Sequence, residues 1–184
     1  MASNSPRRRE LLAGLGLSYE IRVIAGIDES YPLNLPVAEI PLFISQKKAE
    51  AYTLTDAELL ITADTIVCLD NQVLGKPKDN AEACQMLTML SGRTHQVITG
   101  VTLKTTGWMH SFSSTSNVTF TQLTAEEIEY YVKTYHPLDK ASAYGIQEWI
   151  GHIGVTRLEG SYFNVMGLPV QRLYSELKKL NIKI

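Results

Sequence analysis

Cysteine is scarce in this chain of 184 residues, which has only Cys68 and Cys84. Two cysteines cannot build a disulfide framework, and they lack the paired spacing of a zinc site. The scarcity therefore favours a reducing, cytoplasmic location. The length is close to that of one ordinary domain and is enough for a full hydrophobic core. We therefore expect a single domain over residues 1–184, stable without disulfides or a structural metal.

Long apolar runs and an excess of basic residues are also absent. No run approaches the roughly 18–20 apolar residues that a membrane span needs. The opening residues, MASNSPRRRELL, do not follow the order of a signal peptide. Lys and Arg number 17 against 19 Asp and Glu, giving a net charge of −2 and no overall basic footprint for nucleic acid. We expect no membrane and no nucleic-acid partner, so any polyanion must meet locally clustered cations.

Patterns typical of helices and strands alternate along the chain, without an internal repeat or a flexible linker. Helices are expected from Ser5-Pro6, over 41–52, after the capping pairs Asp79/Glu82 and Thr124/Glu127, and from Pro169. Strands are expected over 19–24, 59–69, 96–104 and 116–123, with a turn at Asp70-Asn71. This alternation predicts an α/β domain.

Three arginines, Arg7-Arg8-Arg9, stand in the first turn of the expected first helix. A helix N-terminus carries about half a positive charge, so cations there are unfavourable. Free N–H groups, a cap serine and guanidinium groups together suit a multiply charged anion. A solvated basic patch explains the same residues, and both interpretations stay open.

Asp64 interrupts the apolar run Leu60–Val67. A carboxylate there is costly unless it is paired, hydrogen-bonded or bound to metal. It is either a structural residue in a turn at the strand end or a functional group at the strand's carboxyl end, where α/β proteins place ligand sites. In the second case a metal ligand or a general base is expected.

Two pairs of lysines follow the same logic. One of Lys47 and Lys48 must lie on or beside the buried stripe of its helix, and periodicity does not choose between them. Lys76 and Lys78 lie in a tight loop before the third helix. They are either solvated or provide positive charge to a bound phosphate. The glycine-rich segment 144–169 is equally consistent with a wall around a ligand and with ordinary turns.

Six groups of residues together resemble the Maf family, in order and spacing, over essentially the whole chain. They are Ser3-Asn4-Ser5-Pro6-Arg7-Arg8, Ala63-Asp64-Thr65, Gly75-Lys76-Pro77, Ser91-Gly92-Arg93-Thr94-His95, Tyr144-Gly145-Ile146-Gln147, and Glu159-Gly160-Ser161-Tyr162 with Met166-Gly167-Leu168-Pro169. The resemblance implies a cytoplasmic nucleoside triphosphate pyrophosphatase. It also implies a mixed sheet flanked by helices, with two lobes around a central cleft, as in the inosine triphosphate pyrophosphatase fold. A divalent cation (Mg²⁺ or Mn²⁺) and often a homodimer are implied as well.

The resemblance also assigns the catalytic residues. Asp64 takes the place of the catalytic proton acceptor, and Glu29, Lys48 and Lys76 match the other catalytic positions. The metal would be held by Asp64 and Glu29. The reaction implied is attack of water between the α- and β-phosphates, which yields a nucleoside monophosphate and pyrophosphate. The removal of non-canonical nucleotides is a further role that fits this activity.

The binding residues follow in the same way. Ser5, Arg7 and Arg8 fall in the phosphate-binding turn. Arg7, Thr65 and Gln147 match the positions that mark the branch preferring dTTP and UTP. A branch that acts on 7-methyl-GTP differs at the first two of these positions.

The start of the chain departs from the family pattern. Members usually have a hydrophobic strand leading into the Ser-x-Ser-Pro-Arg turn, whereas only Met1 and Ala2 precede Ser3 here. We expect either a truncated start or a protein without that strand. Two other functions stay open: a nucleotide-binding regulator of cell division and septum formation with little turnover, and a general phosphatase. The product released from a nucleotide distinguishes these from a pyrophosphatase.

Overall fold

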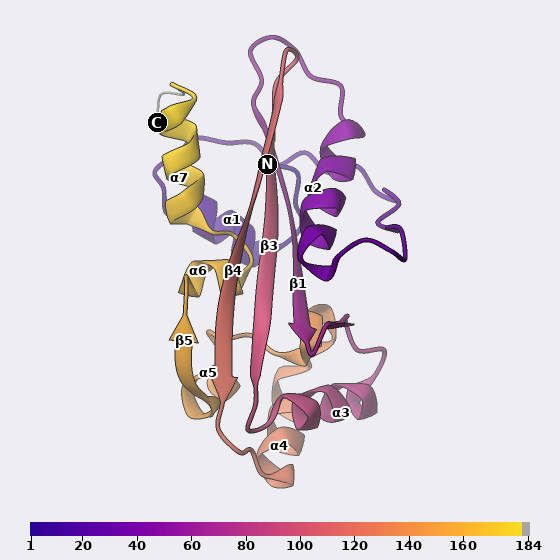
Figure 1. The fold of residues 1–184 in the computed structure, drawn as a ribbon. Coiled ribbons are helices and arrows are strands. Elements are labelled where there is room, and N and C mark those ends of the chain that lie inside the picture. The colour runs from indigo at the N-terminus through magenta and orange to yellow at the C-terminus, as the bar shows by residue number, and fades with distance from the viewer. Residues whose placement is uncertain (182–184) are drawn as a thin grey trace. The chain divides into compact units, whose positions relative to one another are not determined.

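A computed structural model describes residues 1–181 of the chain (Figure 1). Its strands are β1 (Leu60–Leu69), β2 (Gln72–Leu74), β3 (Thr94–Lys104), β4 (Met109–Phe120) and β5 (Val155–Glu159). Its helices are α1 (Pro6–Ala13), α2 (Ile40–Glu50), α3 (Asn80–Leu90), α4 (Ala125–Tyr135), α5 (Trp149–Gly154), α6 (Tyr162–Met166) and α7 (Val170–Lys179). Short 3₁₀ turns cover Val37–Glu39, Pro137–Asp139 and Ala141–Ala143.

The five strands form one sheet in the order β2-β1-β3-β4-β5, flanked by helices. β1 and β2 pair antiparallel, as do β4 and β5, and β3 and β4 form a hairpin through residues 105–108. The expected α/β class, with a helix-flanked sheet, is therefore confirmed. Each hairpin is closed by a short connection, which only antiparallel neighbours allow.

By its internal contacts the chain divides into two compact units. The first unit comprises Met1–Thr65, Ile98–Ser114 and the chain from Phe163, and the second comprises Ile66–Val97 and Thr115–Tyr162. The main core of the first unit packs α1 and α7 against β1, β3 and β4, and its fully buried members are Leu12, Val101, Leu103, Leu168 and Leu173. In the second unit α3 packs against α4.

Local signals in the sequence place several of these elements correctly. The Asp79 carboxylate accepts the Glu82 N–H at 2.8 Å at the start of α3. Thr124 and Glu127 form the reciprocal capping box of α4, with bonds of 3.2 and 2.7 Å. The turn at Asp70-Asn71 has φ values of 50° and 63°, which Asp and Asn tolerate, and it connects β1 to β2.

The strand expected over 19–24 is wrong. The segment runs between α1 and α2 without a strand, and its side chains at 21, 23 and 24 are partly exposed. Its backbone bonds are isolated: the Arg22 N–H donates to Met1 O at 3.2 Å, and the Ile24 N–H donates to the Tyr52 hydroxyl at 2.9 Å. Alternating apolar residues are thus present without the continuous ladder that defines a strand.

The hairpin strands are longer than expected, because β3 starts at Thr94 and β4 covers Met109–Phe120 instead of 116–123. The first half of β4 is polar, and the hydroxyls of Thr102 and Ser111 satisfy each other across the two strands at 2.9 Å. The segment 144–169 forms α5, β5 and α6. A methyl group on Gly151 would lie 1.9 Å from the Ile146 carbonyl oxygen, so close packing requires that glycine.

The α7 helix of the first unit carries a buried carboxylate, which leads to a prediction about acid stability. Glu176 accepts hydrogen bonds from Lys179 Nζ at 3.0 Å and His110 Nε2 at 3.1 Å. The Lys179 bond above all holds the pKa of Glu176 below its ordinary value, with a smaller effect of His110, and desolvation opposes both. A carboxyl whose pKa is lower in the folded protein contributes stability above its unfolded pKa and loses it as the pH falls.

We therefore expect Glu176→Gln to lower the melting temperature at pH 7 and to flatten its decline below about pH 5, where the carboxyl of the unfolded chain begins to bind protons before that of the folded protein does. Melting curves between pH 3 and pH 7 measure this. An identical slope for both proteins would contradict the assignment.

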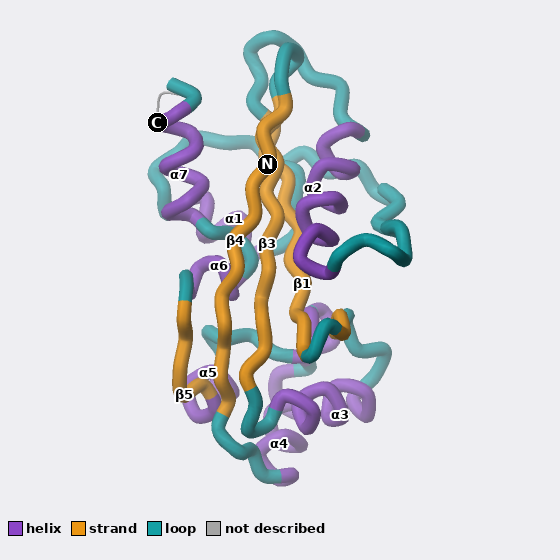
Figure 2. The backbone as a smooth tube through the Cα atoms, viewed as in Figure 1, coloured by secondary structure: helices purple, strands orange, loops and turns teal. Residues whose placement is uncertain are grey.

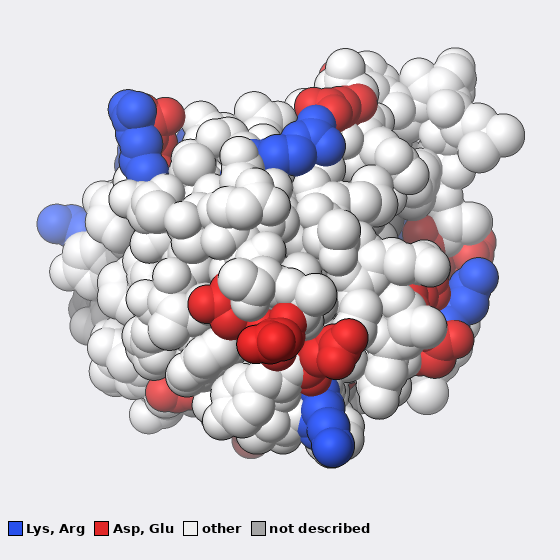
Figure 3. Space-filling view, turned by 90° about the horizontal axis from the view of Figure 1, so that it is seen from below, with Lys and Arg blue, Asp and Glu red and all other residues white. Residues whose placement is uncertain are grey.

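Within residues 1–181, no helix combines the length and the apolar character that crossing a bilayer demands. On the face of the molecule in Figure 3, acidic side chains gather near the middle and the Lys and Arg side chains are isolated.

Candidate functional site

The centre of the candidate site is an ion pair between β1 and α2 in the first unit. Lys48 Nζ lies 2.8 Å from Asp64 Oδ1, and the two side chains are only 15% and 13% exposed. Asp64 stands in the middle of β1, not at the end of the strand as both interpretations required, because the strand continues to Leu69. The lysine explains how a carboxylate is tolerated in an apolar strand. The tertiary structure therefore selects Lys48, where periodicity left the choice open.

A second carboxylate reaches the same ammonium group. Glu29 Oε1 lies 3.0 Å from Lys48 Nζ, and its side chain is 57% exposed. Glu29 belongs to the long connection 14–36 between α1 and α2, part of the loop drawn in teal in Figure 2. Asp64 and Glu29 therefore converge on one cation although they come from a strand and from a loop.

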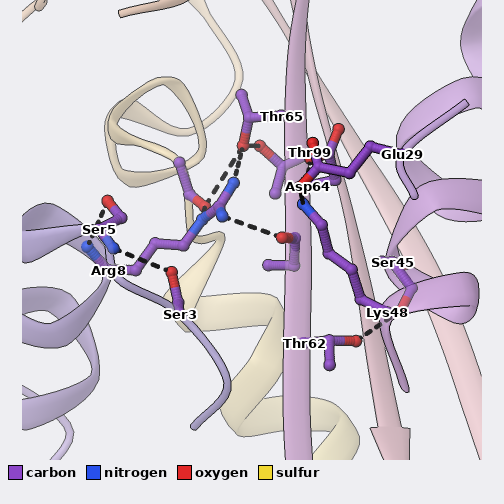
Figure 4. A network of polar contacts seen from close by, with 12 residues as sticks. Ser3, Ser5, Arg8, Glu29, Ser45, Lys48, Thr62, Asp64, Thr65 and Thr99 are labelled. Atoms are coloured by element: carbon purple, nitrogen blue, oxygen red, sulfur yellow. Dashed lines mark hydrogen bonds and ion pairs between the residues drawn. The ribbon is translucent and has the colours of Figure 1, made fainter. Parts of the chain in front are cut away.

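Hydroxyl groups fix α2 against the sheet beneath this ion pair. Thr62 and Asp64 are two residues apart on β1 and so lie on the same face. The Thr62 hydroxyl donates to Ser45 O at 2.6 Å, and the Ser45 and Thr102 hydroxyls are 2.9 Å apart. Ser45 is one turn before Lys48 on α2. The contacts in Figure 4 thus set the distance between Lys48 and the strand that carries Asp64.

The first turn of α1 is a compact polar loop. Ser5 caps the helix and accepts the Arg8 N–H at 3.4 Å, and Ser3 Oγ accepts the Ser5 N–H at 3.2 Å. Arg9 turns back and donates to Ser3 O at 3.2 Å. Arg7 is half-buried in the same turn. Cations are unfavourable at a helix N-terminus, and the bond from Arg9 to a backbone carbonyl partly offsets this cost.

Arg8 ties this turn to β1 and to the chain after α6. Its Nε donates to Gly167 O at 2.8 Å, Nη1 donates to Ala63 O at 2.9 Å, and Nη2 donates to Thr65 Oγ1 at 2.9 Å. Burial lowers the pKa of Arg8, and the nearby Asp64 carboxylate opposes that shift. The guanidinium stays charged, because arginine side chains are not deprotonated in proteins. Three of its five N–H groups are committed, so the side chain is fixed in place before a ligand arrives.

Thr65 continues this network into the core of the first unit. The hydroxyls of Thr65 and Thr99 are 2.9 Å apart, and the Thr99 hydroxyl donates to Asn164 O at 3.1 Å. Thr65 Oγ1 accepts from Arg8 Nη2 and shares a hydrogen bond with Thr99 in which either hydroxyl can donate. Thr65 is thus a support for Arg8. The sequence contained no signal for Thr99, whose partners are 34 and 65 residues away.

Two predicted site residues, Lys76 and Gln147, belong to the second unit. Lys76 is exposed after β2. Gln147 lies in a turn closed by the Glu148 N–H and Gly145 O at 3.0 Å, and the Tyr131 hydroxyl accepts the Gly145 N–H at 3.1 Å. The Gln147 Oε1 atom is buried and has no hydrogen-bond partner within residues 1–181. An acceptor of this kind is costly unless a ligand or water satisfies it.

The converging carboxylates also bear on the predicted metal. Among the described residues, no group of three or more His, Cys, Asp and Glu side chains could hold an ion. Asp64 and Glu29 both contact Lys48 Nζ, so their oxygen atoms can approach one cation. Mg²⁺ commonly uses one or two carboxylates and completes its shell with phosphate oxygens and water. The residues present therefore fit a cation that arrives with a phosphate ligand, and they do not form a closed structural metal site.

Comparisons with known proteins identify the relatives of the chain. Residues 1–180 match the family model described as Maf-like protein. The chain is 62% identical over 182 residues to a protein of Phocaeicola vulgatus named dTTP/UTP pyrophosphatase, covering 98% of this chain and 94% of the relative. A protein of the same name from Bacteroides thetaiotaomicron is 58% identical over 182 residues, which cover 98% of this chain and 94% of the relative. Another, from Parabacteroides distasonis, is 58% identical over 180 residues, which cover 97% of this chain and 93% of the relative.

Proposed function

The chain belongs to the Maf family, and we propose that it is a nucleoside triphosphate pyrophosphatase that hydrolyses dTTP and UTP to the monophosphate and pyrophosphate. The observation that carries the proposal is the contact of Lys48 with both Asp64 and Glu29. An ammonium group and two carboxylates in one place provide a base and a charge for phosphate, and Arg8 adds a second cation in the same unit. The relatives' names supply the choice of nucleotide.

In the proposed reaction, water attacks the anhydride between the α- and β-phosphates. The oxygen of water bonds to phosphorus while the bond to the bridging oxygen breaks, and pyrophosphate leaves with that electron pair. Asp64 accepts the proton of water. Lys48 holds Asp64 Oδ1 at 2.8 Å, which orients the carboxylate before substrate binds.

Charge neutralisation is the other requirement, because the leaving pyrophosphate gathers negative charge. Lys48 and Arg8 supply fixed positive charge, and the serine-capped first turn of α1, with Ser5 and Arg7, is the proposed phosphate-binding element. A divalent cation, Mg²⁺ or Mn²⁺, held by Asp64 and Glu29 would neutralise phosphate oxygens and lower the pKa of a bound water. Lys76, a homodimer and a cytoplasmic location stay predictions from the family resemblance.

The product identifies the reaction. The purified protein is incubated with a panel of nucleoside triphosphates and Mg²⁺ or Mn²⁺, and pyrophosphate, phosphate and monophosphate are quantified. Equal amounts of pyrophosphate and monophosphate support the proposal. Release of inorganic phosphate alone would indicate a general phosphatase, and binding without turnover would indicate a regulator; either result contradicts the proposal.

We also propose that Gln147 reads the base. Uracil and thymine present an N3–H donor beside the O4 acceptor, and the glutamine amide carries the matching acceptor and donor. The buried and unsatisfied Gln147 Oε1 supports this role, because it can accept the N3–H. We expect dTTP and UTP to be the best substrates, CTP to be slower, and ATP and GTP to be poor, since a purine needs more volume.

Gln147→Ala is accordingly expected to narrow the difference in kcat/KM between UTP and the other nucleotides. A site that hydrogen-bonds one edge can reject a mismatch by as much as about 10⁴, because buried polar groups are left unpaired. Initial rates on UTP, CTP and GTP measure the effect. A loss in the same proportion on every substrate would exclude base reading by Gln147.

A further inference from the structure

Two adjacent lysines of α2 bind two adjacent acids of the connection 14–36. Lys48 contacts Glu29, as described above, and Lys47 contacts the residues on either side of it. Lys47 Nζ lies 2.7 Å from Asp28 Oδ2, 3.0 Å from Ser30 O and 3.3 Å from Ser30 Oγ. Three acceptors thus use all three protons that an ammonium group can donate.

The acceptors of Lys47 form a turn of their own. Asp28 Oδ1 accepts the Ser30 N–H at 2.9 Å, and Asp28 Oδ2 accepts the Ser30 hydroxyl at 2.7 Å. Aspartate commonly bonds the backbone two residues ahead in this way. Glu29 stands at the centre of this turn, between Asp28 and Ser30.

Burial contributes little to the position of this turn. The side chains of residues 28–34 are exposed, so this segment has no buried apolar residue that would fix its position. Lys47 and Lys48 provide ion pairs that join this segment to α2. Because Glu29 is itself exposed, its contact with Lys48 depends on where the turn is held.

We propose that Lys47 is a positioning residue for the active site: it holds the turn 28–30 so that the Glu29 carboxylate meets Lys48 and Asp64. The inference rests on the proposed function, in which Glu29 binds the cation that accompanies the substrate. Lys47 itself does not contact Asp64 or the substrate in this scheme. Its effect is on the fraction of molecules in which the site is complete, and apparent affinity scales with that fraction.

A plain electrostatic role for Lys47 predicts a different outcome. If its positive charge only attracted the anionic substrate, Asp28→Asn would leave activity unchanged or increase it, because an acid is removed. Positioning predicts that Lys47→Met and Asp28→Asn both lower activity. It also predicts that the double variant is little worse than either single variant, because the two residues share one contact.

The test uses the full-length protein and two readouts. The first is hydrogen exchange and limited proteolysis of segment 25–35 without nucleotide or metal, where both single variants are expected to exchange the Ser30 amide faster. The second is the Mg²⁺ concentration for half-maximal UTP hydrolysis. It is expected to rise by about three- to tenfold, because a smaller fraction of molecules has the turn 28–30 in place. Lys47→Arg keeps the positive charge and the hydrogen-bond donors. We expect this variant to show nearly wild-type hydrogen exchange and a nearly wild-type Mg²⁺ requirement.

The melting temperature is expected to stay nearly constant, because exposed ion pairs contribute little to stability. Arg157→Met is the matched control: it breaks the exposed ion pair of Arg157 and Glu159 on β5 and should change neither readout. Unchanged exchange of segment 25–35 in Lys47→Met would overturn the inference. So would faster exchange with unchanged Mg²⁺ dependence. Absence of pyrophosphate release by the wild-type protein would refute the proposed function instead, while the exchange data still report on the turn.

Discussion

Asp64→Asn is expected to lower nucleotide hydrolysis by at least about 100-fold, since loss of a general base typically costs 10²–10⁴. Asparagine keeps the size and shape of the side chain, so the packing of β1 should be preserved. It loses the basicity needed to accept a proton from water and the negative charge that Lys48 contacts. The variant should therefore remain folded and bind nucleotide, yet release almost no pyrophosphate.

Steady-state rates with UTP, a melting curve and a nucleotide-binding measurement together check this result. Asp56→Asn is the control, because it also changes an aspartate to an amide, in an exposed contact with Thr106. We expect the control to retain full activity. If Asp64→Asn keeps activity within about threefold of the wild type, Asp64 is not the base.

The second large effect is expected from Gly100→Ala, and it concerns stability. Gly100 lies on β3 under the start of α2, where an added methyl group would be 2.4 Å from Pro41 C, Pro41 O and Leu42 N. These are backbone atoms, so no rotamer change can relieve the clash. Overpacking typically costs 1–3 kcal/mol, and we expect about 3 kcal/mol here. For a chain of this size that lowers the melting temperature by roughly 6–12 °C.

The same substitution should move α2 away from the sheet and with it Lys48, so activity should fall more than the unfolded fraction explains. Gly107→Ala is the matched control, since nothing lies within 4 Å of an added methyl group in that turn. Calorimetry and UTP hydrolysis on both variants test the prediction. Equal melting temperatures for the two variants would show that α2 is not seated on Gly100.

Features that depend on neighbouring residues could be predicted from the sequence. The caps of α3 and α4 and the turn at Asp70-Asn71 are local, because each is made by groups three or fewer residues apart. Asp64 could also be singled out, because an ionised group in an apolar strand requires a partner wherever the chain places it. The family motifs added a role for Glu29 and chose Lys48 over Lys47, which no local pattern did.

Only the tertiary structure decided which partners those residues have. Lys47 and Lys48 are indistinguishable by helical periodicity, yet one binds the turn at Asp28 and the other joins Glu29 to Asp64. Segment 19–24 has the alternation of a strand but no continuous ladder, since strand formation needs a partner as well as a pattern.

Arg8 illustrates the same limit at the site. Its sequence context indicated a cation at a helix N-terminus, whereas the structure commits it to acceptors 55, 57 and 159 residues away. Periodicity and capping report contacts within a few residues, while hydrogen bonds across a sheet or between a helix and a loop depend on the path of the whole chain. Residue types could therefore be predicted for this site, and their pairing was decided by packing.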